Sequence, residues 1–264
     1  MLENRIIPCL LLKDGLLVKT IQFKEPRHIG EPIYAIKIFN DYEVDELVVV
    51  DIMASRHESF DLTSIKQKIP FELISQISDE SCMPITYGGG ISSIEDCRKL
   101  FRAGIEKICI NTHGIRDPQL ITDAADEFGR QSVVVSIDTL QQPDGSYKIV
   151  SHCGLHLHDI NPMTYAMTIE RLGAGEILLN SINRDGMMTG YDVPLIRSVT
   201  SKVRIPVIAL GGAGKMEDFS QALNDGGAAA AAAGSMFVYF GRKKAVLINY
   251  PSRNEINEII NTKN

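Results

Sequence analysis

Short apolar runs alternate with amphipathic stretches along the whole chain, and this alternation constrains the fold more than any other feature. Each run suits one buried strand, and the stretches between them space apolar residues as a helix does. Such repeated βα units predict a parallel sheet. Eight units and 264 residues predict one (β/α)8 barrel domain over residues 1–264. The predicted strands are Arg5–Leu11, Glu46–Asp51, Pro84–Tyr87, Lys107–Asn111, Val133–Asp138, Glu176–Ser181, Pro206–Leu210 and Ala228–Ala233.

Helices are expected between the strands and after the last one. The eighth strand is a run of six alanines, which favours a helix by propensity, but glycines bound it on both sides and favour a strand. Because alanine fills a barrel interior poorly, its neighbours must be bulky. A capping box at Ser252 and Glu255 marks the start of the last helix. The other helices are predicted near residues 32–42, 70–79, 93–103, 117–128, 160–172, 193–201 and 215–225.

The chain also repeats itself. Pro84–Gly90 lines up with Pro206–Gly212, and both segments turn from an apolar run into glycines. Asp14-Gly15 and Asp144-Gly145 lie at corresponding places in the two halves and predict hairpin insertions after strands one and five. We therefore expect a barrel built from two half-barrels of four βα units each.

Composition excludes several classes of protein. A net charge of −6 argues against general binding to nucleic acid or anionic membranes. No apolar run approaches the roughly 20 residues of a membrane helix, and the first residues lack the pattern of a signal peptide. The five cysteines are scattered and odd in number, as in a reduced cytoplasmic protein. We expect a cytoplasmic location, with neither nucleic acid nor membrane as a partner.

In such a barrel the carboxyl ends of the strands face the active site. Asp138 ends an apolar run there, where it could serve as a general acid or base or simply cap a turn. The half-barrel symmetry predicts two phosphate cradles on opposite sides of the mouth. One uses Gly90, Asn111 and Thr112, and the other uses Gly212, Gly234 and Ser235.

Four charged residues lie at the opposite, amino-terminal ends of strands: Arg5, Glu46, Lys107 and Glu176. Their residue types favour four solvated strand starts, because such side chains are usually exposed. The alternative is a neutral, mutually paired ring at the barrel floor.

The sequence also contains a local cluster formed by His152, Cys153, His156 and His158. Metal ligation needs three or four ligands at fixed geometry, and no helix sets the spacing here. Neither a metal site nor a cofactor is predicted.

Several motifs resemble the HisF family, the cyclase subunits of imidazole glycerol phosphate synthase, from residue 1 to about 237. They include Arg5–Leu10, Lys13–Gly15 with Val18-Lys19, Gly88–Ile91, Ile110–Thr112, Gly173–Leu179, Arg184–Gly186 with Gly190–Asp192, and Gly211–Glu217.

The resemblance implies a lyase-type cyclase that receives ammonia from a HisH-like glutaminase docked on the barrel floor. Arg5, Glu46, Lys107 and Glu176 match the charged gate for ammonia, and Glu106 matches the partner interface. The family's substrate is PRFAR, a bis-phosphorylated ribulosyl intermediate of histidine biosynthesis, which is converted to imidazole glycerol phosphate and AICAR. The implied ligand-binding residues are Lys19, Asp51, Gly90, Asn111, Thr112, Asn180, Asp185, Gly186, Gly211, Gly212, Gly234 and Ser235.

The chain departs from the family at the catalytic pair, which is two aspartates at the ends of strands one and five. Asp138 matches the second, but Leu11 occupies the first and cannot transfer a proton. Asn180 and Leu210 stand where the family tends to have threonine and serine. The segment Ile7–Lys13 resembles a WbuZ-type branch associated with surface-polysaccharide genes. That branch is thought to supply ammonia to a separate amidotransferase that makes acetamidino sugars.

Three hypotheses follow. The first is an ammonia-channelling subunit of the amidation branch, acting on a phosphorylated ligand. The second is a histidine-pathway cyclase that tolerates Leu11. The third is an inert barrel that serves as scaffold and activator for its glutaminase.

Overall fold

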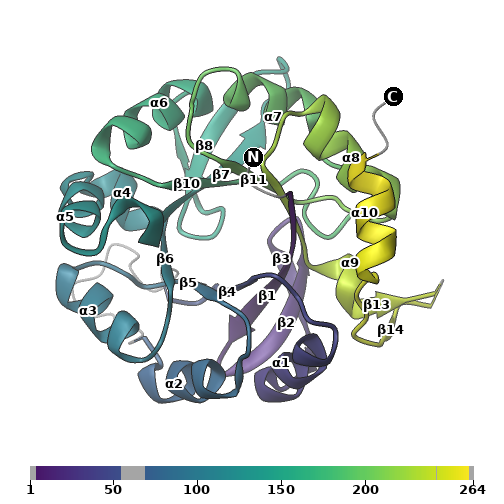
Figure 1. Ribbon diagram of the computed structural model, residues 1–264. Coiled ribbons are helices and arrows are strands. Elements are labelled where there is room, and N and C mark those ends of the chain that lie inside the picture. Colours follow the sequence, from purple (N-terminus) through teal and green to yellow (C-terminus); the bar gives the residue numbers. More distant parts are fainter. Residues whose placement is uncertain (1–3, 55–68, 242, 262–264) are drawn as a thin grey trace.

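The computed structural model describes residues 4–54, 69–241 and 243–261. Eight parallel strands lie in the order β10-β11-β12-β1-β4-β5-β6-β7, and pairing of β10 with β7 closes them into a ring (Figure 1). The predicted (β/α)8 barrel is confirmed. Its strands are β1 (Arg5–Lys13), β4 (Leu47–Asp51), β5 (Ile85–Gly88), β6 (Lys107–Ile110), β7 (Val133–Gln141), β10 (Glu176–Ser181), β11 (Val207–Leu210) and β12 (Ala230–Ala233).

Helices surround this ring, and local sequence explains where several of them begin. Pro32 opens α1 and Pro162 opens α6, at a position where the missing N–H is not needed. Ser252 and Glu255 form the predicted capping box before α10. The helices are α1 (Pro32–Asp41), α2 (Phe71–Glu80), α3 (Ile94–Arg102), α5 (Gln119–Phe128), α6 (Pro162–Leu172), α7 (Val193–Thr200), α8 (Met216–Ser220) and α10 (Arg253–Asn261). None in the described ranges is long and apolar enough to cross a membrane.

Both predicted hairpins are present. After β1 the chain turns at Asp14 and Gly15, whose φ angles of 52° and 80° suit a tight two-residue turn. The turn at Asp144-Gly145 follows β7 but is longer, because Gln141 pairs with Tyr147 and Gly145, with a φ angle of 84°, lies in the loop between them. Each insertion also has a third strand that the sequence does not predict. The two sets are β2 (Leu16–Ile21) with β3 (Lys24–Gly30), and β8 (Tyr147–Ser151) with β9 (His156–His158).

Some predicted boundaries are wrong. The helix expected over 117–128 begins at Gln119, because Pro118 keeps Asp117 out of the helical region. The helix expected over 215–225 changes after α8 into one wide turn, η2 (Gln221–Asp225). The eighth strand starts two residues late, at Ala230. Unpredicted short elements are α4 (Thr112–Arg116), η1 (Arg130–Ser132), α9 (Ser235–Val238), β13 (Tyr239–Phe240) and β14 (Ala245–Val246).

The core has two parts, because successive strand residues face opposite sides of the ring. The larger part lies between strands and helices. The smaller part fills the barrel interior, where Ala230 and Ala232 share space with larger neighbours. Those neighbours are Ile7, Cys9, Val48, Cys109, Val134, Leu178 and Ile208. The alanine strand is therefore compensated by bulky side chains on the other strands, as its composition requires.

Candidate functional site

A pocket of about 1330 Å³, including its open mouth, lies at the carboxyl ends of the barrel strands. The two hairpin insertions contribute to its rim. The structure brings every residue predicted for catalysis or ligand binding to this one pocket. They are Leu11, Lys19, Asp51, Gly90, Asn111, Thr112, Asp138, Asn180, Asp185, Gly186, Gly211, Gly212, Gly234 and Ser235.

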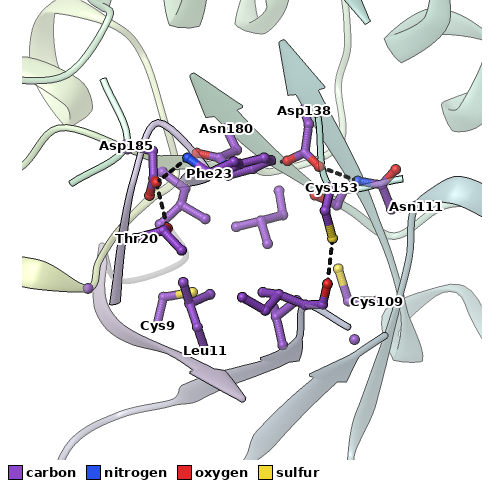
Figure 2. Close-up of a pocket in the computed structure, with 18 of the residues that line it drawn as sticks. Cys9, Leu11, Thr20, Phe23, Cys109, Asn111, Asp138, Cys153, Asn180 and Asp185 are labelled. Atoms are coloured by element: carbon purple, nitrogen blue, oxygen red, sulfur yellow. Dashed lines mark hydrogen bonds between the residues drawn. The ribbon is translucent and has the colours of Figure 1, made fainter. Parts of the chain in front are cut away.

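Asp138 projects from β7 between two amide side chains (Figure 2). Asn111 Nδ2 donates to Asp138 Oδ2 at 2.7 Å, and Asn180 Nδ2 donates to Asp138 Oδ1 at 3.1 Å. Burial raises the pKa of Asp138 to about 6, although the two amide donors oppose this shift. The carboxyl group therefore titrates near neutrality and can act as a general acid or base.

Leu11 lies on the far side of the same pocket from Asp138 (Figure 2). It pairs with Val50 on β4 and Val18 on β2, so its neighbours in the sheet are apolar. The end of β1 carries no proton-transfer group at this position.

On one side of the mouth, the buried Lys19 ammonium lies beside a backbone turn at Gly234, which has no side chain. The Lys19 ammonium donates to the carbonyl oxygen of Cys9 at 2.6 Å, and no carboxylate within the described ranges forms an ion pair with it. Burial lowers the pKa of Lys19. A side chain at Gly234 would lie only 2.4 Å from Lys19 Nζ, so the ammonium lies directly over this turn and the start of α9. Together these donors suit an anion.

The opposite side has a similar build around Gly90, Asn111 and Thr112, where α4 begins. The two halves also share an unusual backbone conformation. The corresponding residues Gly89 and Gly211 have φ angles of 121° and 93°. A Cβ would lie 2.6 Å from the Asp51 carbonyl oxygen at Gly89, and 2.8 Å from the Ser181 carbonyl oxygen at Gly211. Glycine is required at both turns.

The first hairpin is fixed over the pocket by Asp185. Its Oδ2 accepts from Thr20 Oγ1 at 2.8 Å and from the Phe23 backbone N–H at 3.1 Å (Figure 2). Burial raises the pKa of Asp185. Thr20 and Phe23 line the pocket but were not predicted from sequence. Alternation does not indicate Thr20, because Lys19 and Thr20 are adjacent on β2 and both line the pocket, and nothing local marks Phe23. Asp51 instead caps a local turn by accepting from the Met53 N–H at 2.9 Å.

At the opposite end of the barrel, the four charged strand starts form a closed ring of ion pairs. Arg5 pairs with Glu46 and with Glu176, the latter at 2.6 Å. Lys107 pairs with the same two carboxylates, at 3.1 and 2.9 Å. Glu46 is buried and also accepts from Thr86 Oγ1 at 2.9 Å. The expectation of four solvated side chains is wrong, because each group compensates the others. Glu106, beside this ring, is exposed and accepts from the Ile85 N–H at 2.8 Å.

The histidine cluster belongs to the second hairpin. Ser151 Oγ lies 2.8 Å from His152 Nδ1 and 2.7 Å from His158 Nε2. Cys153 Sγ donates instead to the carbonyl oxygen of Ile52, across the pocket rim. Within the described part of the chain, no three histidine, cysteine or acidic side chains converge as metal ligands would.

Comparisons with known proteins agree with this geometry. Residues 5–244 match the family model described as histidine biosynthesis protein. The chain is 46% identical over 97% of its length to a Pseudomonas aeruginosa protein that carries the provisional name imidazole glycerol phosphate synthase subunit hisF2, of which it covers 99%. It is 43% identical to the HisF subunit of this synthase from Hyphomonas neptunium, over 91% of this chain and 92% of that one. It is 41% identical to that of Geobacillus kaustophilus, over 94% and 97%. The chain belongs to the HisF family of imidazole glycerol phosphate synthase subunits.

Proposed function

We propose that this chain is the ammonia-receiving barrel of a glutamine-dependent complex that serves amidation in surface-polysaccharide sugar biosynthesis. The observation that carries the proposal is the contrast between the two ends of the barrel. The charged ring at the floor is intact, while the mouth has Asp138 on one side and Leu11 on the other. In this proposal the ring serves ammonia delivery, and Leu11 removes half of the acid–base pair of a cyclase.

Ammonia would enter from a HisH-like glutaminase bound at the floor, where Glu106 is exposed. Beyond the ring, the barrel interior is lined by apolar side chains such as Ile7, Val48 and Leu178. Ammonia can cross such an interior as the neutral molecule, whereas ammonium would lose its hydration without compensation. The apolar interior thus favours transfer of NH₃ to the pocket.

The pocket would hold a ligand with a phosphate at each end. One phosphate would lie against Gly212, Gly234 and Ser235 near the Lys19 ammonium. The other would lie against Gly90, Asn111 and Thr112. Helices α9 and α4 begin at these two places, and free N–H groups at a helix start are natural phosphate donors.

In this proposal Asp138 is the remaining proton-transfer group, and Asn111 and Asn180 hold its carboxylate in place. Loss of a positioned acid or base typically slows a reaction 10²–10⁴-fold, so Leu11 would leave little of the cyclase reaction. The amidated product would come from a separate amidotransferase that uses the ammonia.

The alternative is a genuine cyclase that makes imidazole glycerol phosphate and AICAR from PRFAR and ammonia. The position of Asp138 favours it: its carboxyl group lies in the pocket between Asn111 and Asn180, and burial raises its pKa to about 6, so one residue could both give and take a proton.

The test supplies purified protein with ammonium and PRFAR, beside a Leu11→Asp variant. The amidation proposal expects little turnover by the natural chain and a gain of at least about tenfold in the variant. Robust turnover of PRFAR by the natural chain would contradict the amidation proposal and support the cyclase. A second assay adds the glutaminase and the amidotransferase. If Asp138→Asn leaves both glutaminase stimulation and amidation unchanged, the barrel acts only as a scaffold.

A further inference from the structure

The side chains at the base of the pocket differ in polarity from one barrel strand to another. Leu210 on β11, Leu11 on β1 and Val50 on β4 all line the pocket and are only partly buried, and their other sides pack on the apolar barrel interior. We call these three residues the apolar strip. Between β11 and β1, strand β12 adds Ala233 to the lining, and Gly234 and Ser235 follow it there.

Three of the remaining strands, β6, β7 and β10, bring polar side chains to the pocket, whereas β5 contributes Gly88. Asn111 follows β6, Asp138 lies on β7 and Asn180 on β10, and hydrogen bonds join the three into one polar wall. Figure 2 shows Leu11 and Asp138 on opposite sides of the cavity. A ligand that spans the pocket therefore meets the three hydrocarbon side chains of the apolar strip on one side, next to the lining residues Lys19, Thr20 and Asp51, and amide and carboxyl groups on the other.

This difference in polarity indicates which ligand groups lie on each side, because apolar lining favours apolar groups and polar lining favours groups that form hydrogen bonds. A hydroxyl group placed on the apolar strip would lose its hydrogen bonds to water and gain none. A methylene, methyl or ring face placed there would gain from removal of apolar surface from water. Polyols such as open-chain sugars therefore fit this side of the pocket poorly.

We propose that the natural ligand is a bis-phosphate whose central segment is apolar on the side that faces Leu11, Val50 and Leu210. The proposal rests on the proposed function for its two phosphates, and it adds the chemistry of the segment between them. Leu11 and Leu210 then have a positive role: they select this ligand, in addition to the loss of a proton-transfer group at β1.

Two series of synthetic probes test the idea. Alkane-α,ω-diol bisphosphates have a hydrocarbon segment between the phosphates. Oligo(ethylene glycol) bisphosphates have the same charges and backbone lengths, but ether oxygens replace some of the methylene groups. Dissociation constants of both series, at several matched lengths, are measured by isothermal titration calorimetry at constant ionic strength. We expect the best alkane probe to bind about tenfold more tightly than its ether match, the effect of burying roughly two methylene groups.

Variants locate the preference. Leu11→Asn and Leu210→Ser, made separately, should each remove most of the difference between the series, whereas the conservative Leu11→Met should keep it. Leu157→Asn, at an exposed position on β9 away from the pocket lining, should also keep it. Circular dichroism shows which variants are folded, and either polar variant is sufficient.

The possible failures are distinct. Equal binding of the two series by the natural chain would overturn the apolar middle while leaving a two-phosphate ligand in place. Failure of both series to bind at any length would overturn the two-phosphate ligand of the proposed function, and this inference with it. A preference that persists in both polar variants would show that the strip is not its source.

Discussion

The floor and the mouth of the barrel each hold a lysine, and the two differ in what surrounds them. Lys107 at the floor lies between two carboxylates, Glu46 and Glu176, and Arg5 completes the set. Lys19 at the mouth is more deeply buried and donates to the Cys9 carbonyl oxygen; among the described residues no carboxylate forms an ion pair with it, although Asp185 is near enough to raise its pKa. The charges at the floor therefore balance one another within the chain, whereas the positive charge of Lys19 at the mouth can be balanced by an anionic ligand.

The largest effect should come from breaking the floor. Lys107→Met leaves the buried Glu46 and the partly buried Glu176 with Arg5 alone. Because removing one member of a buried ion-pair set leaves charge uncompensated, the free energy of unfolding should fall by about 3 kcal/mol. Urea denaturation at pH 7 measures this change.

The matched control is Lys37→Met on α1, where Lys37 is half exposed and pairs loosely with Glu80 at 3.7 Å. Exposed pairs contribute little to stability, so the control should unfold almost as the natural chain does. If both variants lose the same stability, the ring at the floor is no more than a set of surface charges.

At the mouth, Asp138→Asn should change how stability depends on pH. Folding raises the pKa of Asp138 from 3.8 to about 6, so the folded state favours the protonated form. The stabilisation is fully present below pH 4 and is lost as the pH rises through 6. Relative to the natural chain, the variant should therefore gain about 2 kcal/mol between pH 4 and pH 8.

Thermal unfolding across this pH range measures the effect. Asp126→Asn, at an exposed position on α5, changes the net charge equally and separates the local effect from a general one. Parallel pH profiles for the natural chain and Asp138→Asn would contradict the raised pKa.

The smallest stability change should come from Lys19→Met, and it should have the opposite sign to that at Lys107. The pKa of Lys19 is lowered because its burial outweighs the attraction of Asp185, so an apolar side chain of similar length should raise the free energy of unfolding by about 1 kcal/mol. The variant should also lose most of the stabilisation that millimolar inorganic phosphate gives the natural chain. Destabilisation as large as that of Lys107→Met would erase the proposed difference between floor and mouth.

Hydrophobic periodicity predicted the barrel well, because each strand and helix buries a face of its own. It placed Glu176–Ser181 without error and found both hairpin turns from their Asp-Gly pairs. The six alanines show where a local rule fails, since their helix propensity is overridden by the sheet that they complete.

The pocket was predictable only in part. Position at a strand end placed Asp138 and Asn111 correctly, but not the hydrogen bond between them, which depends on how β6 and β7 pair. Phe23 reaches the pocket through the bond of its backbone to Asp185, more than 150 residues away, and no local pattern encodes that contact. Residue type alone gave a wrong prediction for the barrel floor. Each of the four charged residues is usually exposed when considered singly, but in the structure the four form ion pairs with one another.

The alanine strand has a consequence for how the barrel forms. β12 pairs with β1, so the ring closes between Arg5 and Ala230, which are distant in sequence, and alanine methyl groups offer little apolar surface to drive that step. The closing seam is held instead by outside elements: Tyr191 donates to the Ala232 carbonyl oxygen, and Tyr250 donates to that of Ile6. We expect this seam to form last in folding and to open first, so that its amide hydrogens exchange with solvent before those of β6 and β7. The barrel would then open locally into a curved sheet at the β12–β1 seam, and the hydrogen bonds of two tyrosines outside the ring would determine how often it opens.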